Sequence, residues 1–212
     1  MSKFNFVKTD IPEVQIWYND GKKEATAITK AEARKLAKAC RAAVDLHTVG
    51  HAMAGVLFAL PAWQHADTVL AFASMPDEPD TADILRQALA ESKRLLLPRV
   101  LSRTEMDWVE ITALSQLQPG AYGILEAPAS LPAFDTAHLG DGALALIPCL
   151  AASPDGVRLG RGGGYYDRFL AHYKGRRLLV CPTAALLGDL PCEGWDVRFS
   201  PHEILTKKGI LL

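Results

Sequence analysis

Three consecutive segments, ALALI (143–147), RLGRGGGYYDRFL (158–170) and RLLVC (177–181), decide which fold this chain is expected to adopt. The first and third are short and apolar throughout, which is typical of strands buried on both faces of a parallel sheet. The middle segment carries a glycine run, and a helix is expected over 164–173. Open parallel sheets bind ligands in the crevice beside the carboxyl ends of their strands. The three segments therefore predict an α/β fold with a ligand site at the glycine run.

The alternation of helices and apolar strands continues toward the N-terminus. Thr29 and Glu32 form a capping-box pattern, a hydroxyl followed three residues later by a glutamate, which predicts a helix start. Helices are expected over 30–45, 49–60 and 82–91, and strands over 68–73, 94–97 and 106–111. This order predicts an α/β/α arrangement of three layers with a mostly parallel sheet. We expect a single such domain over 29–212, containing a long loop over 118–142, after an irregular or weakly extended N-terminal extension over 1–28.

The composition limits the classes of partner. With 49% hydrophobic residues in a chain of 212, there is enough apolar material for one buried core. The formal net charge is -1, so the chain lacks the overall positive field that attracts nucleic acid. No stretch approaches the roughly 20 apolar residues that span a bilayer, and the N-terminus has no secretory pattern. We therefore expect a small-molecule substrate, no nucleic-acid partner, no membrane partner, and a protein that works as a monomer.

The cysteines indicate neither a zinc site nor a disulfide framework. They form no CxxC pair and have no histidine cluster beside them. The four are Cys40, Cys149, Cys181 and Cys192. A reducing, cytoplasmic setting is the expectation that follows.

The glycine run suits an anion. Glycines at 160 and 162–164 let backbone N–H groups approach an anion without Cβ obstruction, and the N-terminus of the following helix adds partial positive charge. Arg158 and Arg161 supply full charges, a combination that suits a polyphosphate. A Walker A loop requires Gly-Lys-Ser/Thr, which is absent, and the GxGxxG pattern fails because Tyr165 stands at its third glycine. The glycines and arginines alone leave a flexible surface loop as an equal alternative.

The continuation Tyr-Tyr-Asp-Arg-Phe-Leu changes that balance, because residues 158–170 as a whole resemble the signature of the 5-formyltetrahydrofolate cyclo-ligase family. The similarity extends over residues 30–206 in the order typical of the family. The matching residues are Lys30, Arg34, SMPDE (74–78), LPRV (97–100), Met106, Asp107, YGI (122–124) and Glu126. The resemblance implies a fold similar to sugar-phosphate isomerases and CoA transferases.

The resemblance also implies an activity, the ATP- and Mg²⁺-dependent cyclisation of the reduced folate 5-formyltetrahydrofolate to 5,10-methenyltetrahydrofolate with release of ADP and phosphate. In this reaction a phosphorylated formyl intermediate forms, because an amide oxygen leaves poorly and its phosphate leaves well. One alternative is a regulatory protein that binds folate and nucleotide without turnover. Another is a sugar-phosphate isomerase or acyl-CoA transferase, although fold similarity alone does not decide function.

The resemblance assigns candidate roles residue by residue. Arg161 and Tyr166 are the candidate catalytic residues, and Asp167 is the candidate Mg²⁺ ligand. The candidate folate-binding residues are Ala73, Met75, Glu78 and Tyr165. The candidate ATP-binding residues are Lys30, Arg34, Arg158, Leu159, Gly160, Arg161, Gly162, Gly163, Gly164, Tyr165 and Tyr166.

Lys30 and Arg34 are four residues apart, so both project from one face of the first helix. By spacing alone, that face is a solvated basic surface in preference to a phosphate clamp. The resemblance assigns Lys30 and Arg34 to ATP phosphates and leaves Lys38 and Arg41 on the solvated surface.

The acidic residues depart from the family pattern at one point. The family has a second metal-assisting acid four positions after the residue that matches Asp196, and this chain has Ser200 there. Either Asp196 substitutes for it or Asp167 holds Mg²⁺ alone with water. Asp167 also has a plain alternative role as a helix cap. Trp108 is expected to pack and not to line the folate site.

Overall fold

The computed structural model describes residues 5–8, 15–18, 28–120 and 123–211. Within the N-terminal extension, β1 (Asn5–Lys8) and β2 (Gln15–Tyr18) pair as an antiparallel hairpin. The extension therefore contains regular strands where the sequence suggested irregular or weakly extended chain.

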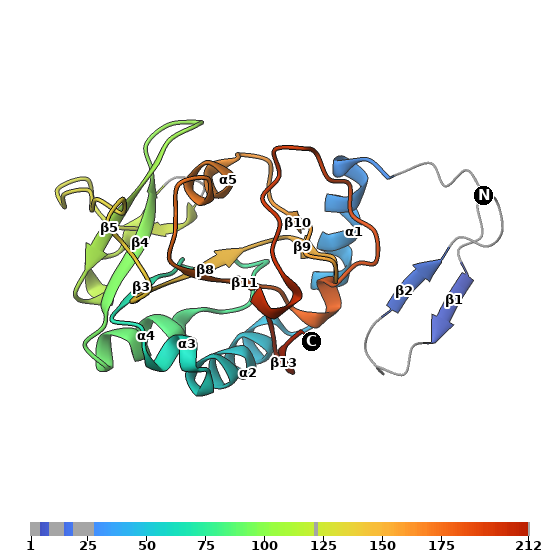
Figure 1. Ribbon diagram of the computed structural model, residues 1–212, viewed down its shortest axis with the longest axis horizontal. Helices are drawn as coiled ribbons and strands as arrows, with labels where there is room; N and C mark the ends of the chain where they lie inside the picture. The colour runs from blue at the N-terminus through green and yellow to red at the C-terminus, as the bar shows by residue number, and fades with distance from the viewer. Residues whose placement is uncertain (1–4, 9–14, 19–27, 121–122, 212) are drawn as a thin grey trace.

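A seven-stranded sheet forms the centre of the molecule, in the order β13-β12-β11-β8-β3-β4-β5 (Figure 1). Neighbouring strands from β12 to β4 run parallel, while the edge strands β5 and β13 are antiparallel to their neighbours. The strands are β3 (Thr68–Leu70), β4 (Arg94–Val100), β5 (Met106–Ile111), β8 (Ala143–Pro148), β11 (Arg176–Val180), β12 (Ile204–Thr206) and β13 (Gly209–Ile210). The mostly parallel sheet is confirmed.

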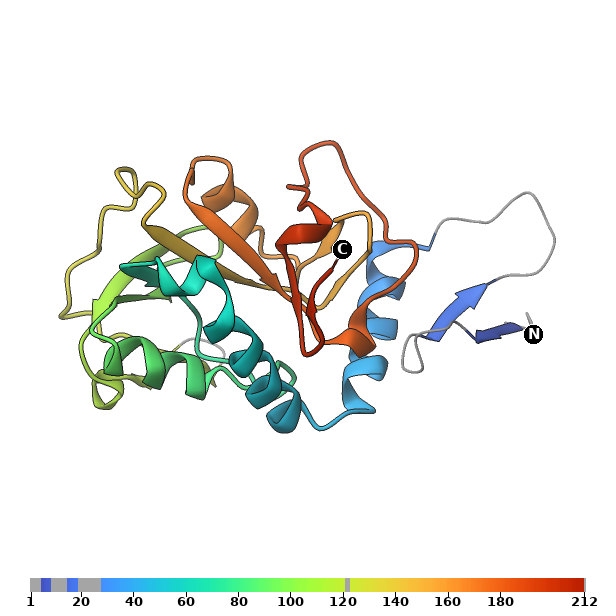
Figure 2. The same ribbon diagram turned by 60° about the horizontal axis from the view of Figure 1, so that its bottom comes forward.

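Helices cover both faces of the sheet, as Figures 1 and 2 show. On one face lie α1 (Lys30–Ala42) and α5 (Tyr165–Leu170), and on the other α2 (Leu46–Ala59), α3 (Pro61–Gln64) and α4 (Ala82–Ala90). Successive strand residues point to opposite faces. Leu70 therefore belongs to the core under α1 and α5, and its neighbour Val69 to the core under α2 to α4. The three layers predicted from the sequence are present.

Shorter pieces complete the chain. The long loop over 118–142 contains the paired strands β6 (Gln118–Pro119) and β7 (Leu125–Glu126). A second small hairpin joins β9 (Ala151–Ala152) to β10 (Arg158–Leu159) just before the glycine run. Among the described residues, 3-10 turns cover Leu114–Gln116, Thr183–Ala185 and Pro201–Glu203.

The boundary between the first two helices lies earlier in the chain than predicted, because of a helix cap. The capping box at Thr29 and Glu32 is confirmed, with Glu32 N–H donating to Thr29 Oγ1 over 3.2 Å. Asp45 was expected inside the first helix, but its carboxylate accepts hydrogen bonds from the N–H groups of His47 and Thr48. An aspartate in this role is an N-cap. The first helix therefore ends at Ala42, and the second begins at Leu46 instead of 49.

The strand predicted over 94–97 was expected to end at Pro98, but β4 continues through this proline to Val100. The pairing of β3 with β4 ends at Leu96, whereas β5 pairs with β4 as far as Val100. Beyond Leu96, β4 thus has one neighbour, and a proline is tolerated in a strand where one side lacks a partner. Other boundaries move by a few residues: β3 stops at Leu70 instead of 73, and α5 spans 165–170 instead of 164–173.

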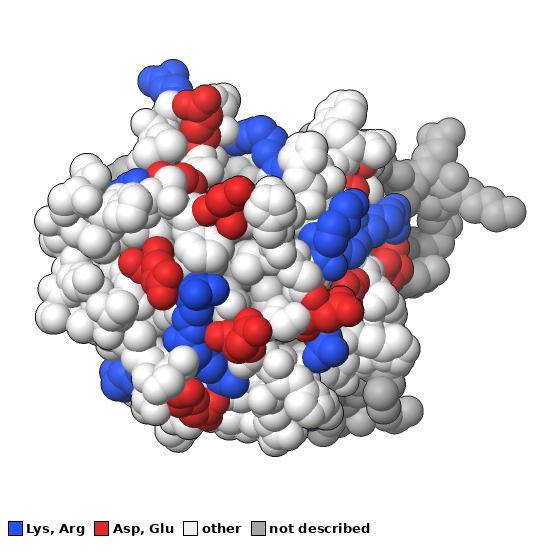
Figure 3. All heavy atoms as spheres, turned by 60° about the vertical axis from the view of Figure 1, so that its left-hand side comes forward, with Lys and Arg blue, Asp and Glu red and all other residues white. Residues whose placement is uncertain are grey.

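No single helix in the described part of the chain is long and apolar enough to cross a membrane; α1 and α2 pass such a test only as a pair, and they are bent by 90°. On the face seen in Figure 3, Lys and Arg side chains alternate with Asp and Glu. That face carries no large field of a single sign.

Candidate active site

A cavity of about 650 Å³ lies where the central strands end, as expected for an open parallel sheet. Phe72 and Ala73 follow β3, Pro98 and Val100 belong to the end of β4, and Pro148 closes β8. The glycine run at 160–164 forms the opposite wall. The location predicted from the three opening segments is therefore a hollow of ligand size.

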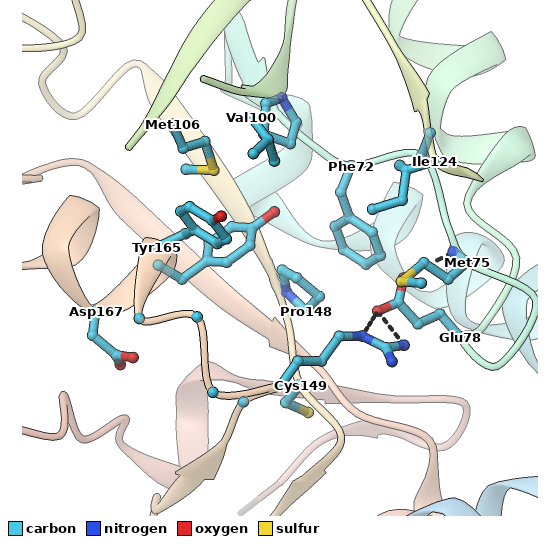
Figure 4. Close-up of a pocket in the computed structure, with 18 of the residues that line it drawn as sticks. Phe72, Met75, Glu78, Val100, Met106, Ile124, Pro148, Cys149, Tyr165 and Asp167 are labelled. Atoms are coloured by element: carbon cyan, nitrogen blue, oxygen red, sulfur yellow. Dashed lines mark hydrogen bonds and ion pairs between the residues drawn. The ribbon is translucent and has the colours of Figure 1, made fainter. Parts of the chain in front are cut away.

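The cavity is lined by apolar side chains, with Glu78 among them, and by the glycine run (Figure 4). The apolar residues are Phe72, Ala73, Met75, Pro98, Val100, Met106, Ile124, Leu125 and Pro148. The polar and glycine residues include Glu78, Arg103, Glu126, Arg158, Gly160, Arg161, Gly162, Gly163, Gly164, Tyr165, Tyr166 and Asp167. Such a cavity suits a ligand with a flat apolar body and a charged end.

Most of the residues singled out from the sequence line this cavity. Ala73, Met75 and Glu78 lie on the side of the β3–α4 loop, and residues 158 and 160–167 on the side of the glycine run. Leu159 is buried in the core behind it. Lys30 and Arg34 are not among the lining residues.

The glycine run lies against α1 in a conformation that requires glycine. Gly162 has a φ of 101° and Gly164 a φ of 68°, values that side chains disfavour. Arg34 Nε donates to Gly160 O over 3.0 Å, and a Cβ at Gly162 would lie 3.3 Å from Arg34 Nη2. Arg34 thus supports the loop from behind. The helix that follows has six residues, so the positive charge of the loop comes mainly from its arginines.

Arg161 is held by two carboxylates from the β3–α4 loop. Its Nη2 lies 3.0 Å and its Nε 3.2 Å from Glu78 Oε1, and its Nη1 lies 3.1 Å from Asp77 Oδ2. Burial alone would raise the pKa of Asp77, but the hydrogen bonds from Arg161 hold it below its ordinary value. Burial lowers the pKa of Arg161, and its bonds to Asp77 and Glu78 outweigh that effect. The guanidinium is therefore charged and oriented.

Glu78 is 7% exposed, and both of its oxygens have protein partners. Oε1 accepts from Arg161, and Oε2 accepts from the Met75 N–H over 2.9 Å. A carboxylate has about four lone-pair positions, so Glu78 keeps capacity for a further N–H donor. Figure 4 shows Glu78 and Met75 on the same side of the cavity as Phe72 and Ile124.

Asp167 faces the cavity in an ion pair with Arg158, whose Nη1 lies 3.1 Å from Asp167 Oδ1. Arg158 is anchored by a bond from Nε to Pro148 O, and its guanidinium lies over the Tyr166 ring. Within the described residues, no group of three or more His, Cys, Asp and Glu side chains is arranged to hold a metal ion. Asp167 is thus a single carboxylate beside the glycine run.

The two tyrosines have different surroundings. The Tyr165 hydroxyl donates to Ser102 O over 2.7 Å, which ties the glycine run to the β4–β5 turn. Tyr166 packs against Trp108, and burial together with the charge of Glu78 raises the pKa of its phenol. Tyr166 therefore stays protonated and is able to donate a hydrogen bond. Trp108 is 3% exposed and packs on Phe169 at 5.0 Å without lining the cavity, as expected.

Lys30 and the acidic residues near the C-terminus form a separate cluster. Lys30 Nζ lies 2.8 Å from Asp196 Oδ2 and 2.6 Å from Glu193 Oε2. Burial raises the pKa of Asp196, but the hydrogen bonds from Lys30 and from the Glu193 N–H, together with the nearby positive charges, outweigh burial and hold this pKa below its ordinary value. Ser200 caps the turn at Pro201–Glu203, and neither Ser200 nor Asp196 lines the cavity.

Arg41 contradicts the expectation of a solvated basic face, whereas Lys38 is exposed as expected. Arg41 is 1% exposed and donates to the backbone carbonyls of Asp77 and Leu150 over 2.6 and 3.0 Å, and also to that of Cys149. The physical reason is that three carbonyl oxygens replace water around its charge.

Sequence reasoning missed part of the cavity. Phe72, Pro148 and Cys149 lie at strand ends, where the crevice rule alone would have found them. The other lining residues outside the candidate set are Arg103 and Leu125, which no pattern singled out, and Pro98, Val100, Met106, Ile124 and Glu126, which matched the family without a site role. They come from the β4–β5 hairpin and the long loop, which approach the site only through tertiary packing.

Comparisons with known proteins identify the family of the chain. The family model described as the 5-formyltetrahydrofolate cyclo-ligase family matches residues 25–207. A 5-formyltetrahydrofolate cyclo-ligase of Mycolicibacterium smegmatis is 30% identical over 68% of this chain and 76% of its own length. The Escherichia coli protein of the same name is 31% identical over 62% and 74%.

A solved structure is also similar. The 5,10-methenyltetrahydrofolate synthetase of Aquifex aeolicus superposes with a TM-score of 0.73 at 25% identity, covering 86% of this chain and 92% of that one. The resemblance read from residues 158–170 is thereby confirmed together with the α/β fold. The chain belongs to the 5-formyltetrahydrofolate cyclo-ligase family.

Proposed function

We propose that this chain catalyses the ATP- and Mg²⁺-dependent cyclisation of 5-formyltetrahydrofolate to 5,10-methenyltetrahydrofolate, with release of ADP and phosphate. The observation that carries the proposal is the cavity itself, in which an apolar wall at the ends of β3 and β4 faces a glycine run with two arginines. Membership of the cyclo-ligase family supports it.

The apolar wall suits the folate. A flat pterin ring packs favourably against Phe72, Met75 and Ile124, while Glu78 accepts hydrogen bonds from ring N–H donors. Ala73 completes this part of the wall, and Tyr165 lines the cavity from the side of the glycine run. The formyl end of the substrate then faces the glycine run, where Figure 4 shows Tyr165 and Asp167.

The glycine run suits the triphosphate of ATP. Gly160 and Gly162 to Gly164 present backbone without Cβ atoms, and Arg158 and Arg161 provide charge in the same wall. Leu159, buried behind the run, anchors it in the core. Arg34 supports the loop from behind, whereas the charge of Lys30 is paired with Glu193 and Asp196 outside the cavity lining.

Asp167 fits Mg²⁺ as one carboxylate, because this ion needs only one or two carboxylates when phosphate oxygens and water complete its shell. When bound, Mg²⁺ neutralises phosphate charge. Asp196 does not line the cavity, so we assign the metal to Asp167 alone.

The protein contributes fixed charge and orientation. ATP supplies the phosphoryl group that turns the formyl oxygen into a leaving group, through a phosphorylated formyl intermediate. N10 then attacks the formyl carbon, its proton leaves to water, and the C–O bond breaks to release phosphate. Arg161 holds positive charge where negative charge shifts between oxygens, and Tyr166 donates a hydrogen bond as a neutral phenol. Neither role requires a general base.

A protein that binds folate and nucleotide without turnover is the second candidate. The observation that favours it is Ser200, which stands where the family has an acidic residue and caps a turn instead. One assay separates the two. The purified chain is mixed with 5-formyltetrahydrofolate, ATP and Mg²⁺, and methenyltetrahydrofolate absorbance and ADP are followed together. Equal amounts of both products support the enzyme; binding of both ligands without products supports the regulatory protein.

A further inference from the structure

Arg41 occupies an unusual position for an arginine. It lies in the last turn of α1 and is 1% exposed, and its pairing is with backbone carbonyls. Its Nη2 is buried without a hydrogen-bond partner among the described residues. A buried guanidinium with an unsatisfied donor is costly. An arginine buried at such a cost is expected to have a role that compensates for it.

The three carbonyls that Arg41 contacts belong to two segments of the cavity wall. The carbonyl of Asp77 lies in the β3–α4 loop, which carries the two carboxylates that hold Arg161. The carbonyls of Cys149 and Leu150 directly follow β8, and Cys149 itself lines the cavity. Arg41 therefore joins the support of Arg161 to the floor of the site.

We infer that Arg41 is a positioning residue, which acts through the Asp77–Glu78 segment to hold Arg161 over the glycine run. It lies outside the cavity lining, so its effect on a ligand is transmitted and not direct. The inference rests on the proposed function in that it takes Arg161 to be the residue that meets the phosphates. Without Arg41, the backbone at Asp77 loses its link to the end of β8. The two carboxylates then no longer fix the guanidinium of Arg161.

A double-mutant cycle distinguishes positioning from a general structural role. Arg41→Gln, Arg161→Ala and the double variant are compared with the unaltered chain in kcat/KM for ATP and in the dissociation constant of ATP from calorimetric titration. If Arg41 acts through Arg161, Arg41→Gln lowers the affinity for ATP by about tenfold when Arg161 is present. In the Arg161→Ala chain, the same substitution lowers that affinity by less than about twofold. An equal loss of ATP affinity in both backgrounds overturns the inference.

Arg177→Gln is the matched control. Arg177 is half-buried, and it pairs with Glu203 and with Arg198 O, none of which lines the cavity. It is expected to leave ATP affinity unchanged in both backgrounds. Melting temperatures are measured for every variant. If Arg41→Gln does not fold, Arg41→Lys replaces it in the same cycle, because lysine keeps the charge and satisfies fewer carbonyls.

Two failures remain distinguishable. An unaltered chain that binds ATP without forming methenyltetrahydrofolate contradicts the proposed function, while the cycle in ATP affinity still decides the role of Arg41. If the unaltered chain is active but Arg41→Gln lowers ATP affinity equally in both backgrounds, the proposed function stands and the positioning role of Arg41 is refuted.

Discussion

Arg161 and Glu78 are joined directly: Nη2 and Nε of the arginine lie 3.0 and 3.2 Å from Oε1 of the glutamate. The first residue comes from the glycine run and the second from the β3–α4 loop, so the ion pair bridges the proposed phosphate and pterin subsites. A ligand that attracts Arg161 therefore also changes the hydrogen-bond acceptor capacity that Glu78 has for the other ligand.

This bridge predicts coupled binding. A phosphate near Arg161 weakens its bond to Glu78 and frees Oε1 for the folate, so each ligand should strengthen the other by about fivefold. The measurement is the dissociation constant of 5-formyltetrahydrofolate with and without a non-hydrolysable ATP analogue. Glu78→Gln should abolish most of this coupling, whereas Glu110→Gln, on the outer part of β5, should preserve it. Independent binding in the unaltered chain would refute the coupling.

Arg161→Ala is expected to raise the KM for ATP and lower kcat by about 100-fold in total, because one fixed charge beside the transferring phosphoryl group is lost. Arg198→Ala serves as the control, since Arg198 is exposed and pairs with the exposed Asp155. Arg41 is not a suitable control, because it is buried. Steady-state kinetics at saturating folate provide the comparison, and equal losses in both variants would show that the phosphates bind elsewhere.

The Mg²⁺ dependence of activity should distinguish the role of Asp167 from that of Ser200. Asp167→Asn should shift half-maximal activity to a Mg²⁺ concentration about tenfold higher, because the carboxylate facing the glycine run is lost. Ser200→Asp should leave the Mg²⁺ dependence unchanged, since Ser200 caps a turn outside the cavity. Titration of activity with Mg²⁺ tests both variants. A tighter Mg²⁺ requirement in Ser200→Asp would indicate that the missing family acid lies within reach of the metal.

The Lys30–Asp196 pair predicts a pH-dependent contribution to stability. The folded-state pKa of Asp196 lies below its unfolded value, so its stabilisation is present above pH 3.8 and is lost as the pH falls through the folded pKa. Burial lowers the pKa of Lys30, but its bonds to Asp196 and Glu193 raise it overall, so the upper limit lies above pH 10.5. Asp196→Asn should therefore cost about 1 kcal/mol of unfolding free energy at pH 7. Urea unfolding at pH 7 and pH 3 checks this, and a cost that persists undiminished at pH 3 contradicts it.

The sequence predicted the architecture well because its strands are nearly continuous apolar runs. The runs at 143–147 and 106–111 became β8 and β5 with almost the same bounds. The error at Pro98 arose because a proline breaks a strand only where its N–H is needed, and that depends on the neighbouring strand.

The site was predictable where residues are contiguous and less so where packing assembles it. The run at 160–164 lines the cavity, and so do Met75 and Glu78 of the SMPDE segment. Arg41 has the same spacing as its exposed neighbours on α1, and only the carbonyls of distant segments explain its burial. Arg103 and Ile124 reach the cavity from a hairpin and a loop, whose approach no local pattern encodes.

The central claim is that the chain closes the folate ring by phosphorylating the formyl oxygen. The most direct test supplies 5-formyltetrahydrofolate labelled with ¹⁸O in the formyl group, together with ATP and Mg²⁺, and analyses the products by mass spectrometry. The prediction is methenyltetrahydrofolate, ADP and inorganic phosphate that carries the label. Unlabelled phosphate, or ATP and folate recovered unchanged, would contradict it.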